Sequence, residues 1–391
     1  MRRIGVISVD GHVKASRQGY RDYVDPGVRG DYDAHVKALE DAGMPDTGNC
    51  NPAWGVEVQW DSDARLAALE AKGVVAEVLF PNGVPFQLNP FEDHARAERP
   101  ELAKAGRRAY NRWLSDFCAE APGRRFGAAL VSFDDVSQGV EDIHWAREHG
   151  LGGIMLPCPA PRMFFDPVLD PLWAAAEELD MTLCQHGGIG GDSYAPAGFA
   201  AIMTIAVESG FFSNRSLWQM IFGGVFDRFP KLRATFIETQ LAFIPQVVQT
   251  VDRRLANTDD WMRFASHLGR DRSFKKLMSD YMHSNVYYGV SPFSPVQLPL
   301  DEMLGLSDDD EFHLGVDHVM YGVDFPHFES NYASTGEEIA NLVAHPGVTS
   351  SDVRKILFDN ALDVFNFDRA TLAPHVQRVG LDISSDLALT R

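Results

Sequence analysis

The sequence predicts a (β/α)₈ TIM barrel that carries additional loops and helices at its rim. The first observation is a series of eight short apolar runs, which lack the polar–apolar alternation of a half-exposed strand. Uninterrupted apolar runs of this kind are typical of parallel strands that are buried on both faces. The runs comprise residues 4–9, 74–81, 126–133, 153–157, 182–185, 234–237, 286–290 and 319–323.

Helix-like segments between several of these runs provide the second observation. They include residues 62–72, 101–119, 136–148 and 169–179. Strand–helix alternation that is repeated eight times, with right-handed crossovers, closes most simply into a barrel. The alternative is an open, doubly wound sheet, but no Gly-rich dinucleotide-binding motif follows any of the runs.

We predict one barrel domain over residues 1–368 and a C-terminal tail over 369–391. Two long segments do not belong to a minimal barrel: residues 13–61 follow the first strand, and residues 189–230 follow the fifth. Insertions after strands emerge at the C-terminal rim of a barrel, where active sites lie, so we expect both to cover the site. The tail has no evident place in the barrel, and we expect it to pack on a neighbouring subunit.

The charge balance limits the kinds of partner. The 391 residues include 35 Lys and Arg against 55 Asp and Glu, a formal net charge of −20. So acidic a protein repels phosphate backbones and anionic lipids, which argues against nucleic acid or a membrane surface as a partner. We therefore expect a small-molecule substrate.

Cysteine usage and hydropathy predict a cytoplasmic protein. The four cysteines form no C-x-x-C pair, which is typical of reduced, structural thiols in a cytosolic protein. No apolar run reaches the roughly 18 residues of a transmembrane helix. The apolar stretch near the N-terminus is too short for a signal peptide.

Three of the predicted strands end in residues that can bind a metal ion. Asp10 and His12 lie two residues apart at the end of the first strand, so their side chains point the same way. His186 follows the fifth strand and Asp324 the eighth. Because the C-terminal ends of barrel strands meet at one rim, we expect these four side chains to converge. Two imidazoles and two carboxylates suit Zn²⁺, with Mn²⁺ or Fe²⁺ also compatible.

Each of these residues also has a more ordinary interpretation. An Asp-x-His pair is common by chance, and a single histidine at a strand end is more often a hydrogen-bonded structural residue. Their joint occurrence at the first, fifth and eighth strand ends favours a metal site. Asp324 is at the same time the candidate general base of that site.

Two histidines and an arginine are further candidates at the rim. His327, three residues after Asp324, is a candidate acid or substrate anchor, and its alternative role is a hydrogen bond at a helix start. Arg215 is a candidate carboxylate clamp, since arginine binds carboxylates through a bidentate fork. His283 precedes the seventh strand and either reaches the site or lies at the surface.

Three other residues are candidate substrate contacts. Asn82 follows the second strand and could donate a hydrogen bond to a substrate. Trp54 and Trp218 could stack on a planar ring, although packing in the core is the commoner role of such residues.

Three short motifs extend this interpretation. They are Asp-Gly-His at 10–12, Gly-Gly-Val-Phe-Asp-Arg-Phe-Pro-Lys-Leu at 223–232, and Gly-Val-Asp-Phe-Pro-His at 322–327. The sequence resembles, over about residues 4–367, the amidohydrolase-related family that includes aminocarboxymuconate-semialdehyde decarboxylase. This resemblance implies a barrel fold, one metal ion per site, and either hydrolysis or non-oxidative decarboxylation. It also implies a homodimer, and the metal-ligand pattern of the family falls on the four residues proposed above.

One position departs from the family pattern. Decarboxylases of the family carry a histidine at the end of the sixth strand, where this chain has Glu238. A histidine there can act as acid or base near neutral pH. A glutamate can do so only with a raised pKa, or it can serve as a base while ionised. Glu238 is thus a candidate catalytic residue; the alternative is that it orients Arg233 or a metal-bound water.

The leading functional hypothesis is metal-dependent hydrolysis of a small cyclic or unsaturated carboxylic-acid-like substrate by a metal-activated water. Asp324 would be the general base, and Glu238 or His327 would return the proton to the leaving group. The second hypothesis is non-oxidative decarboxylation of an aromatic or dienoic acid, in which Asp324 or His327 protonates the carbon. A hydratase and a non-catalytic ligand-binding barrel are further alternatives, and the filled ligand positions argue against the latter.

Overall fold

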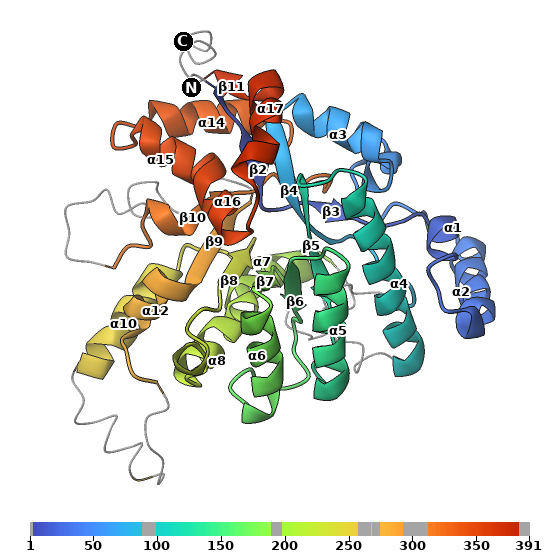
Figure 1. Cartoon of the computed structure of the whole chain (residues 1–391), viewed down its shortest axis with the longest axis horizontal. Helices are drawn as coiled ribbons and strands as arrows, with labels where there is room; N and C mark the ends of the chain where they lie inside the picture. Colours follow the sequence, from blue (N-terminus) through green and yellow to red (C-terminus); the bar gives the residue numbers. More distant parts are fainter. Residues whose placement is uncertain are drawn as a thin grey trace.

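The computed structural model describes residues 3–87, 99–188, 198–256, 267, 274–291 and 312–382. Eight parallel strands form a nearly closed barrel, and neighbouring strands follow the order of the sequence (Figure 1). Each strand lies within one of the predicted apolar runs or overlaps it, so the predicted fold is confirmed. The strands are β2 (Val6–Ser8), β4 (Val74–Pro81), β5 (Arg125–Leu130), β6 (Gly153–Leu156), β7 (Thr182–His186), β8 (Ala234–Ile237), β9 (Val286–Val290) and β10 (Val319–Tyr321).

The first and eighth strands come together through backbone hydrogen bonds. Val9 N donates to Tyr321 O over 3.0 Å, beyond the end of β2. The chain then continues into the short strand β3 (His12–Val13), which pairs with β4. The Val9–Tyr321 hydrogen bond joins the two ends of the nearly closed barrel and places the chain that follows β2 beside the chain that follows β10.

Helices surround the barrel and cover the outer faces of its strands (Figure 1). Several begin at a side chain that satisfies a free backbone N–H: Asp61 accepts from Ala64 N, and Asp135 accepts from Gln138 N. The helices are α1 (Arg17–Tyr20), α2 (Arg29–Asp41), α3 (Ser62–Glu70), α4 (Pro100–Ala119), α5 (Val136–Glu148), α6 (Asp170–Glu178), α7 (Phe199–Ser213), α8 (Arg215–Phe222), α9 (Val225–Arg228), α10 (Ile244–Ala256), α12 (Met278–Asn285), α14 (Thr335–Ala344), α15 (Ser350–Arg354), α16 (Asn360–Val364) and α17 (Arg369–Val379). Among the described helices, none has the length and apolar character that crossing a bilayer requires.

The first insertion, residues 13–61, lies against the chain that follows β10. It contains α1, α2 and three short 3₁₀ turns, and Asn51 N donates to Pro326 O over 2.8 Å. The backbone of Cys50 also pairs with that of His327 in an isolated antiparallel β-bridge. In the second insertion, residues 189–197 lie outside the described part, and the remainder forms α7, α8 and α9.

The described part of the C-terminal tail packs on its own barrel, and the expected contact with a neighbouring subunit stays a prediction. Helix α17 buries Leu372, and β11 (Leu381–Asp382) pairs antiparallel with β1 (Arg3–Ile4). Since β1 precedes the first barrel strand, this two-stranded sheet lies at the N-terminal end of the barrel, away from the predicted metal ligands. Residues 383–391 lie outside the described part.

Candidate metal centre and active site

The four predicted metal ligands converge at the C-terminal ends of the barrel strands. Asp10 lies between β2 and β3, His12 begins β3, and His186 is the last residue of β7. Asp324 follows β10, where its backbone N–H donates to Asp10 O over 3.0 Å. All four residues are almost fully buried, with at most 2% exposure.

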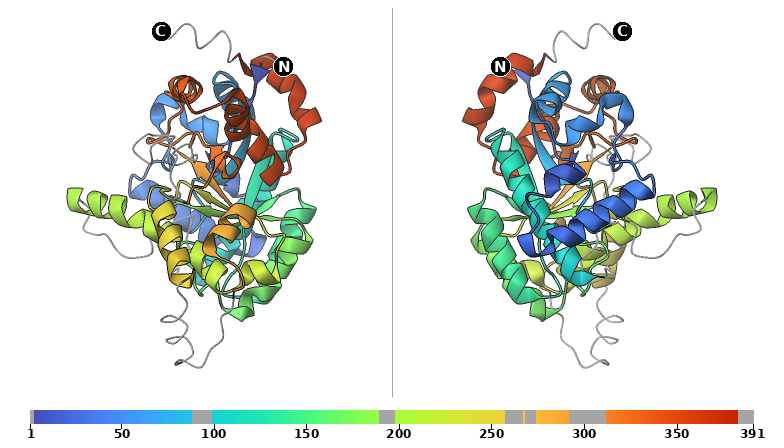
Figure 2. Two further views of the ribbon diagram at one scale, coloured as in Figure 1. Left: turned by 90° about the vertical axis from the view of Figure 1, so that its left-hand side faces the viewer. Right: turned by 90° about the vertical axis from the view of Figure 1, so that its right-hand side faces the viewer.

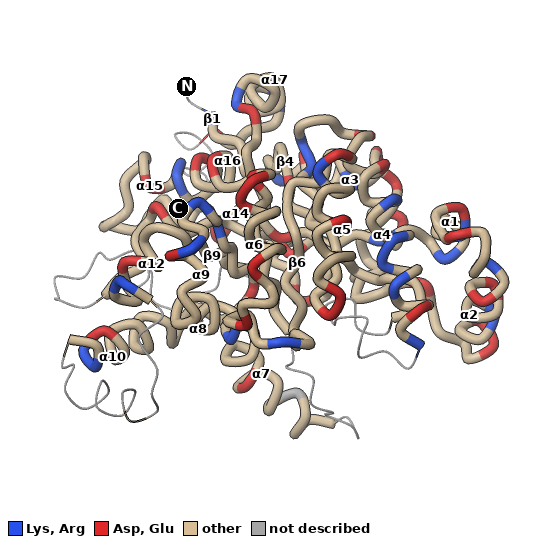
Figure 3. Tube along the Cα trace, turned by 60° about the horizontal axis from the view of Figure 1, so that its bottom comes forward, with Lys and Arg blue, Asp and Glu red and all other residues tan. Residues whose placement is uncertain are grey.

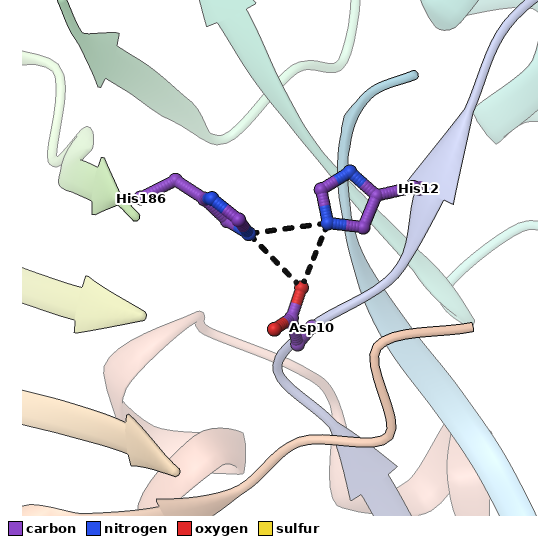
Figure 4. Close-up of side chains that lie close together, drawn as sticks. All are labelled: Asp10, His12 and His186. Atoms are coloured by element: carbon purple, nitrogen blue, oxygen red, sulfur yellow. Dashed lines mark hydrogen bonds and ion pairs between the residues drawn. The ribbon is translucent and has the colours of Figure 1, made fainter. Parts of the chain in front are cut away.

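The ligand atoms of Asp10, His12 and His186 face one another within hydrogen-bond distance (Figure 4), and Asp324 contacts this group through His12. His12 Nε2 lies 3.2 Å from Asp10 Oδ1 and 3.2 Å from Asp324 Oδ1. His186 Nε2 lies 3.3 Å from the same Asp10 oxygen and 3.1 Å from His12 Nε2. Asp10, His12 and His186 therefore form one group of ligand atoms, and His12 also belongs to a second group with Asp324 and His327.

The donor set fits a divalent cation. Asp10 Oδ2 and Asp324 Oδ2 are buried and accept no hydrogen bond from the described residues. Burying a carboxylate oxygen without a donor is unfavourable, and a metal ion would supply the missing positive charge. Nitrogen and oxygen ligands in this combination suit Zn²⁺, Mn²⁺ or Fe²⁺.

The surrounding charges favour an ionised Asp10. Burial alone opposes the charged form, but the charge of His186 and hydrogen bonds from His12 and His186 hold the pKa of Asp10 well below its usual range. A carboxylate that stays ionised in a buried site is ready to bind a cation without losing a proton first.

Two carboxylate residues of the site have left-handed backbone conformations. The φ angle is 56° at Asp324 and 54° at Glu238, which L-residues other than glycine rarely adopt. Such a conformation is unfavourable by about 1–3 kcal/mol and persists where the surrounding structure imposes it. Glu238 lies directly after β8 and Asp324 three residues after β10, and the sharp change of chain direction at each residue turns its carboxylate toward the rim of the barrel.

His327 completes the centre on the side of the first insertion. Its ring stacks on His12 with 3.8 Å between ring centroids, and its Nδ1 lies 3.0 Å from Asp324 Oδ1. Burial opposes protonation of His327, but hydrogen bonds with Asp324 and Glu329 raise its pKa to about 9. His327 Nε2 lies 3.2 Å from Asn82 Oδ1, so Asn82 contacts this histidine directly.

Glu238 lies at the mouth of the same centre, just after β8. Its Oε2 is 3.8 Å from His186 Nε2, and its side chain retains 25% exposure. Burial and the negative charges of Asp324 and Asp10 raise its pKa well above the usual value for a glutamate. Arg233 instead pairs with Asp180 over 2.7 Å, so the alternative that Glu238 orients Arg233 finds no support.

Sequence reasoning missed a buried ion pair, Arg65–Glu77, that contacts the backbone beside the proposed metal ligands. The guanidinium of Arg65 bonds both oxygens of Glu77 at 2.8–3.0 Å, and both residues are at most 2% exposed. Arg65 also donates to His12 O over 3.0 Å and to Phe325 O over 3.3 Å. A Cβ at Gly11 would lie 3.0 Å from Arg65 Nη2, which explains the glycine of the Asp-Gly-His motif. The signal that could have revealed the pair is Glu77 itself, a charged residue inside an apolar strand run.

A second group that the sequence did not indicate extends the hydrogen bonds around His327. Glu329 Oε1 lies 3.5 Å from His327 Nδ1 and accepts from Asn49 Nδ2 over 2.8 Å. Asn82 Nδ2 donates to Gln59 Oε1 over 2.7 Å. Asn49 and Gln59 belong to the first insertion, so that segment contributes polar side chains to the site.

Four predicted substrate contacts lie elsewhere in the described structure. Arg215 lines a cavity of about 300 Å³ together with Gln185, whose side chain points away from that of its neighbour His186 because strand residues alternate. Trp218 packs on Phe211, with 5.3 Å between ring centroids. The other two, Trp54 and His283, contact neither Arg215 nor Trp218.

Trp54 and His283 contact other groups of the protein at a distance from the proposed metal ligands. Trp54 packs against Phe325 and Tyr332, with ring centroids 5.5 and 5.1 Å away, on the outer side of the chain that follows β10. His283 Nε2 lies 2.9 Å from His313 O, and its ring also contacts His318. Because α12 precedes β9, His283 lies near the N-terminal ends of the strands, at the end opposite the metal ligands.

Comparison with known proteins places this geometry in context. The sequence profile of the amidohydrolase family matches residues 9–367. No curated protein sequence shows significant similarity to the chain. Solved structures with the same fold include 5-carboxyvanillate decarboxylase from Sphingomonas paucimobilis, at 19% identity and a TM-score of 0.67, with coverage of 93% of this chain and 100% of that one.

Two further structures resemble the chain to a similar extent. The 5-carboxyvanillate decarboxylase of Novosphingobium aromaticivorans, complexed with manganese and 4-hydroxy-3-methoxy-5-nitrobenzoic acid, is 19% identical, with a TM-score of 0.65 and coverage of 93% and 97%. The 2,6-dihydroxybenzoate decarboxylase from Rhizobium is 18% identical, with a TM-score of 0.63 and coverage of 93% and 99%. At these identities the likeness establishes the common barrel.

Proposed function

Because the chain belongs to the amidohydrolase family and is an enzyme of that superfamily, we propose that it is a metal-dependent, non-oxidative decarboxylase of a small aromatic or dienoic acid. The observation that carries this proposal is the contact of His327 Nδ1 with Asp324 Oδ1, at 3.0 Å, inside the cluster of metal ligands. It puts a group that can deliver a proton beside a site for an anionic substrate. Barrels of the same fold that act on 5-carboxyvanillate and 2,6-dihydroxybenzoate support the choice of substrate class.

The metal ion would be held by Asp10, His12, His186 and Asp324. Zn²⁺ is the expectation from the sequence, and the manganese in a structural relative makes Mn²⁺ an equal candidate. When bound, the ion would supply a positive charge that fixes the substrate carboxylate and a neighbouring oxygen.

The residues around the ion would supply the proton that the reaction requires. Decarboxylation breaks the bond between the ring carbon and the carboxylate, CO₂ leaves, and the bonding electron pair remains on the ring carbon. That carbon must then receive one proton, so a carboxylate anion and a proton give the decarboxylated product and CO₂. We assign this proton to the His327–Asp324 pair, in which Asn82 fixes the orientation of the imidazole through Nε2.

Product analysis in D₂O tests the proposal. With Mn²⁺- or Zn²⁺-loaded protein and a panel of hydroxybenzoic and dienoic acids, we expect one CO₂ per substrate consumed and one deuteron at the carbon that lost the carboxylate. Asp324→Asn should lower kcat by about 10²- to 10⁴-fold, because the variant loses both a ligand and a proton carrier. Asp317→Asn, which alters an exposed ion pair with Lys355, is the control and should retain activity. Turnover without CO₂ and without deuterium in the product would reject decarboxylation.

Hydrolysis is the second candidate function, and Glu238 is the observation that favours it. A carboxylate at the end of β8 replaces the histidine that resemblance to the family's decarboxylases leads one to expect. It lies 3.8 Å from His186 and is reachable from the mouth of the barrel. In this position Glu238 could hold a water molecule or protonate a leaving group.

Substitution of Glu238 separates a catalytic role from a structural one. We expect Glu238→Gln to lower kcat by about 10²-fold or more while the metal content stays at the wild-type level, because Glu238 is not among the four proposed ligands. Glu238→Asp retains the acid and should lose less activity. Steady-state kinetics beside elemental analysis of each variant measure both quantities. Full activity of Glu238→Gln would show that Glu238 takes no part in the chemistry.

A further inference from the structure

A cavity of about 300 Å³ lies beside helix α8, outside the metal centre. Its walls are formed by the segment that follows β6, by β7, by the end of α7 and by the first turns of α8. Helix α7 projects from the side of the barrel (Figure 2), so the cavity lies where α7 joins the barrel. We call it the α8 cavity, after Arg215, Ser216 and Gln219, which line it from that helix.

The wall of the barrel separates the α8 cavity from the metal centre. Gln185 and His186 are neighbours in β7, and because strand side chains alternate, Gln185 lines the cavity while His186 faces the other proposed ligands. The side chain of Gln185 is fixed at both ends: its Nε2 donates to His186 O over 2.9 Å, and its Oε1 accepts from Ser216 Oγ over 2.8 Å. Among the described lining residues there is no proposed metal ligand, so an occupant of the cavity would leave the centre free.

The α8 cavity is positively charged in a strongly acidic protein. Arg162 and Arg215 line it, and no Asp or Glu is among its described lining residues. Across the chain, acidic side chains outnumber basic ones by 55 to 35, and they are spread over the helices around the barrel (Figure 3). Neither arginine forms an ion pair with a described residue. Two guanidinium groups at one cavity without a counter-ion favour an anionic occupant.

The rest of the lining suits an apolar body attached to that anion. The guanidinium carbon of Arg215 lies over the ring of Phe212, 6.0 Å from its centroid. The buried Phe164 and three prolines of the segment after β6 add further apolar surface. Gln219 holds this segment in place, since its Oε1 accepts from Phe164 N over 2.9 Å. Apolar walls with a few polar groups, in a volume at the small end of ligand pockets, are typical of a site for a small organic molecule.

We propose that the α8 cavity is a second binding site, separate from the metal centre, for a small organic acid. Arg215 and Arg162 bind the carboxylate, because the arginine fork matches the two oxygens of that group. Phe212 and Phe164 pack against the apolar body of the acid. A simple inorganic anion would leave these apolar walls without a partner. This inference does not depend on the reaction that the metal centre catalyses.

Binding of benzoate to the full-length, metal-loaded protein tests the proposal. Isothermal titration calorimetry should detect a binding event with a dissociation constant below about 1 mM. Arg215→Met should weaken this event by about 10- to 100-fold, because a charge-assisted contact is lost, and Arg215→Lys should weaken it less. Arg162→Met changes an exposed side chain that does not endanger folding, and it should also lower the affinity. Arg21→Met, which removes a half-exposed arginine of the first insertion, is the matched control and should bind benzoate as wild type does.

A crystal structure of the metal-loaded protein with 4-bromobenzoate separates the two sites, because the anomalous signal of bromine locates the ligand. We expect a bromine peak in the α8 cavity, whether or not a second peak lies at the metal centre. A signal at the metal centre alone would overturn the proposal, as would equal affinities of wild type, Arg215→Met and Arg162→Met for benzoate. So would benzamide, which has the same ring without the charge, if it binds as tightly as benzoate. Inorganic phosphate that displaces benzoate with equal affinity would show that the apolar walls have no role, and it too would reject an organic-acid site.

Discussion

Replacing His12 with alanine is expected to empty the metal centre and to abolish turnover. His12 Nε2 lies within 3.2 Å of ligand atoms of Asp10, His186 and Asp324, so this imidazole is the group that all the other ligands share. Removing a residue that merely orients a ligand lowers metal affinity by about 10- to 100-fold, and the loss of a ligand itself should exceed that. Elemental analysis after dialysis should fall from about one ion per chain to a trace, and kcat should fall below detection.

The matched control is a histidine at the other end of the barrel. His318 Nδ1 lies 2.8 Å from Val286 O, and His318 has no contact with the metal centre. His318→Ala should therefore keep its metal ion and its activity, even if it is somewhat less stable. If the wild type binds no Zn²⁺, Mn²⁺ or Fe²⁺ when these are supplied in excess, the proposed centre is wrong, whatever His12→Ala does.

The fold could be predicted because local sequence carries most of its information. Each barrel strand is a short apolar run, since a parallel strand buried on both faces cannot alternate. The residue range of β9, 286–290, agrees with the predicted run at both ends. The C-terminal tail could not be placed in this way, because β11 pairs with β1 across the whole length of the chain and no local pattern specifies that partner.

The convergence of the four proposed metal ligands could be predicted for a related reason, whereas the positions of the other candidate residues could not. Asp10, His186 and Asp324 follow strands, and the barrel brings all strand ends to one rim. His283 lies at the surface, the second of the two locations that the sequence left open, because it precedes a strand and residues before a strand lie at the opposite end. Arg215 lies on a helix of the second insertion, and the way in which an inserted helix packs depends on tertiary contacts that spacing alone does not reveal.

The prediction with the largest expected effect on stability concerns Arg65. Arg65→Met keeps an unbranched apolar side chain but removes the guanidinium, so that among the described residues the buried Glu77 retains only Arg125 as a partner, whose Nε lies 3.5 Å away. Removing one partner of a buried ion pair destabilises a protein by about 3–5 kcal/mol, because the remaining charge stays buried without adequate compensation. Urea denaturation of metal-free protein measures this loss. Arg21→Met, which breaks an ion pair with Asp33 whose side chains are both 49% exposed, is the control and should lose far less.

The same substitution separates a role in folding from a role in positioning the metal ligands. Arg65 binds the carbonyl oxygens of His12 and Phe325, one in each of the two segments that carry His12 and Asp324. If it holds these segments in register, Arg65→Met at a temperature where it remains folded should bind Zn²⁺ or Mn²⁺ about 10- to 100-fold more weakly than wild type. Titration of the metal-free protein with Zn²⁺ provides this readout. If the variant is less stable but binds the metal as tightly as wild type, the Arg65–Glu77 pair has a structural role only. The metal ligands would then keep their positions without Arg65.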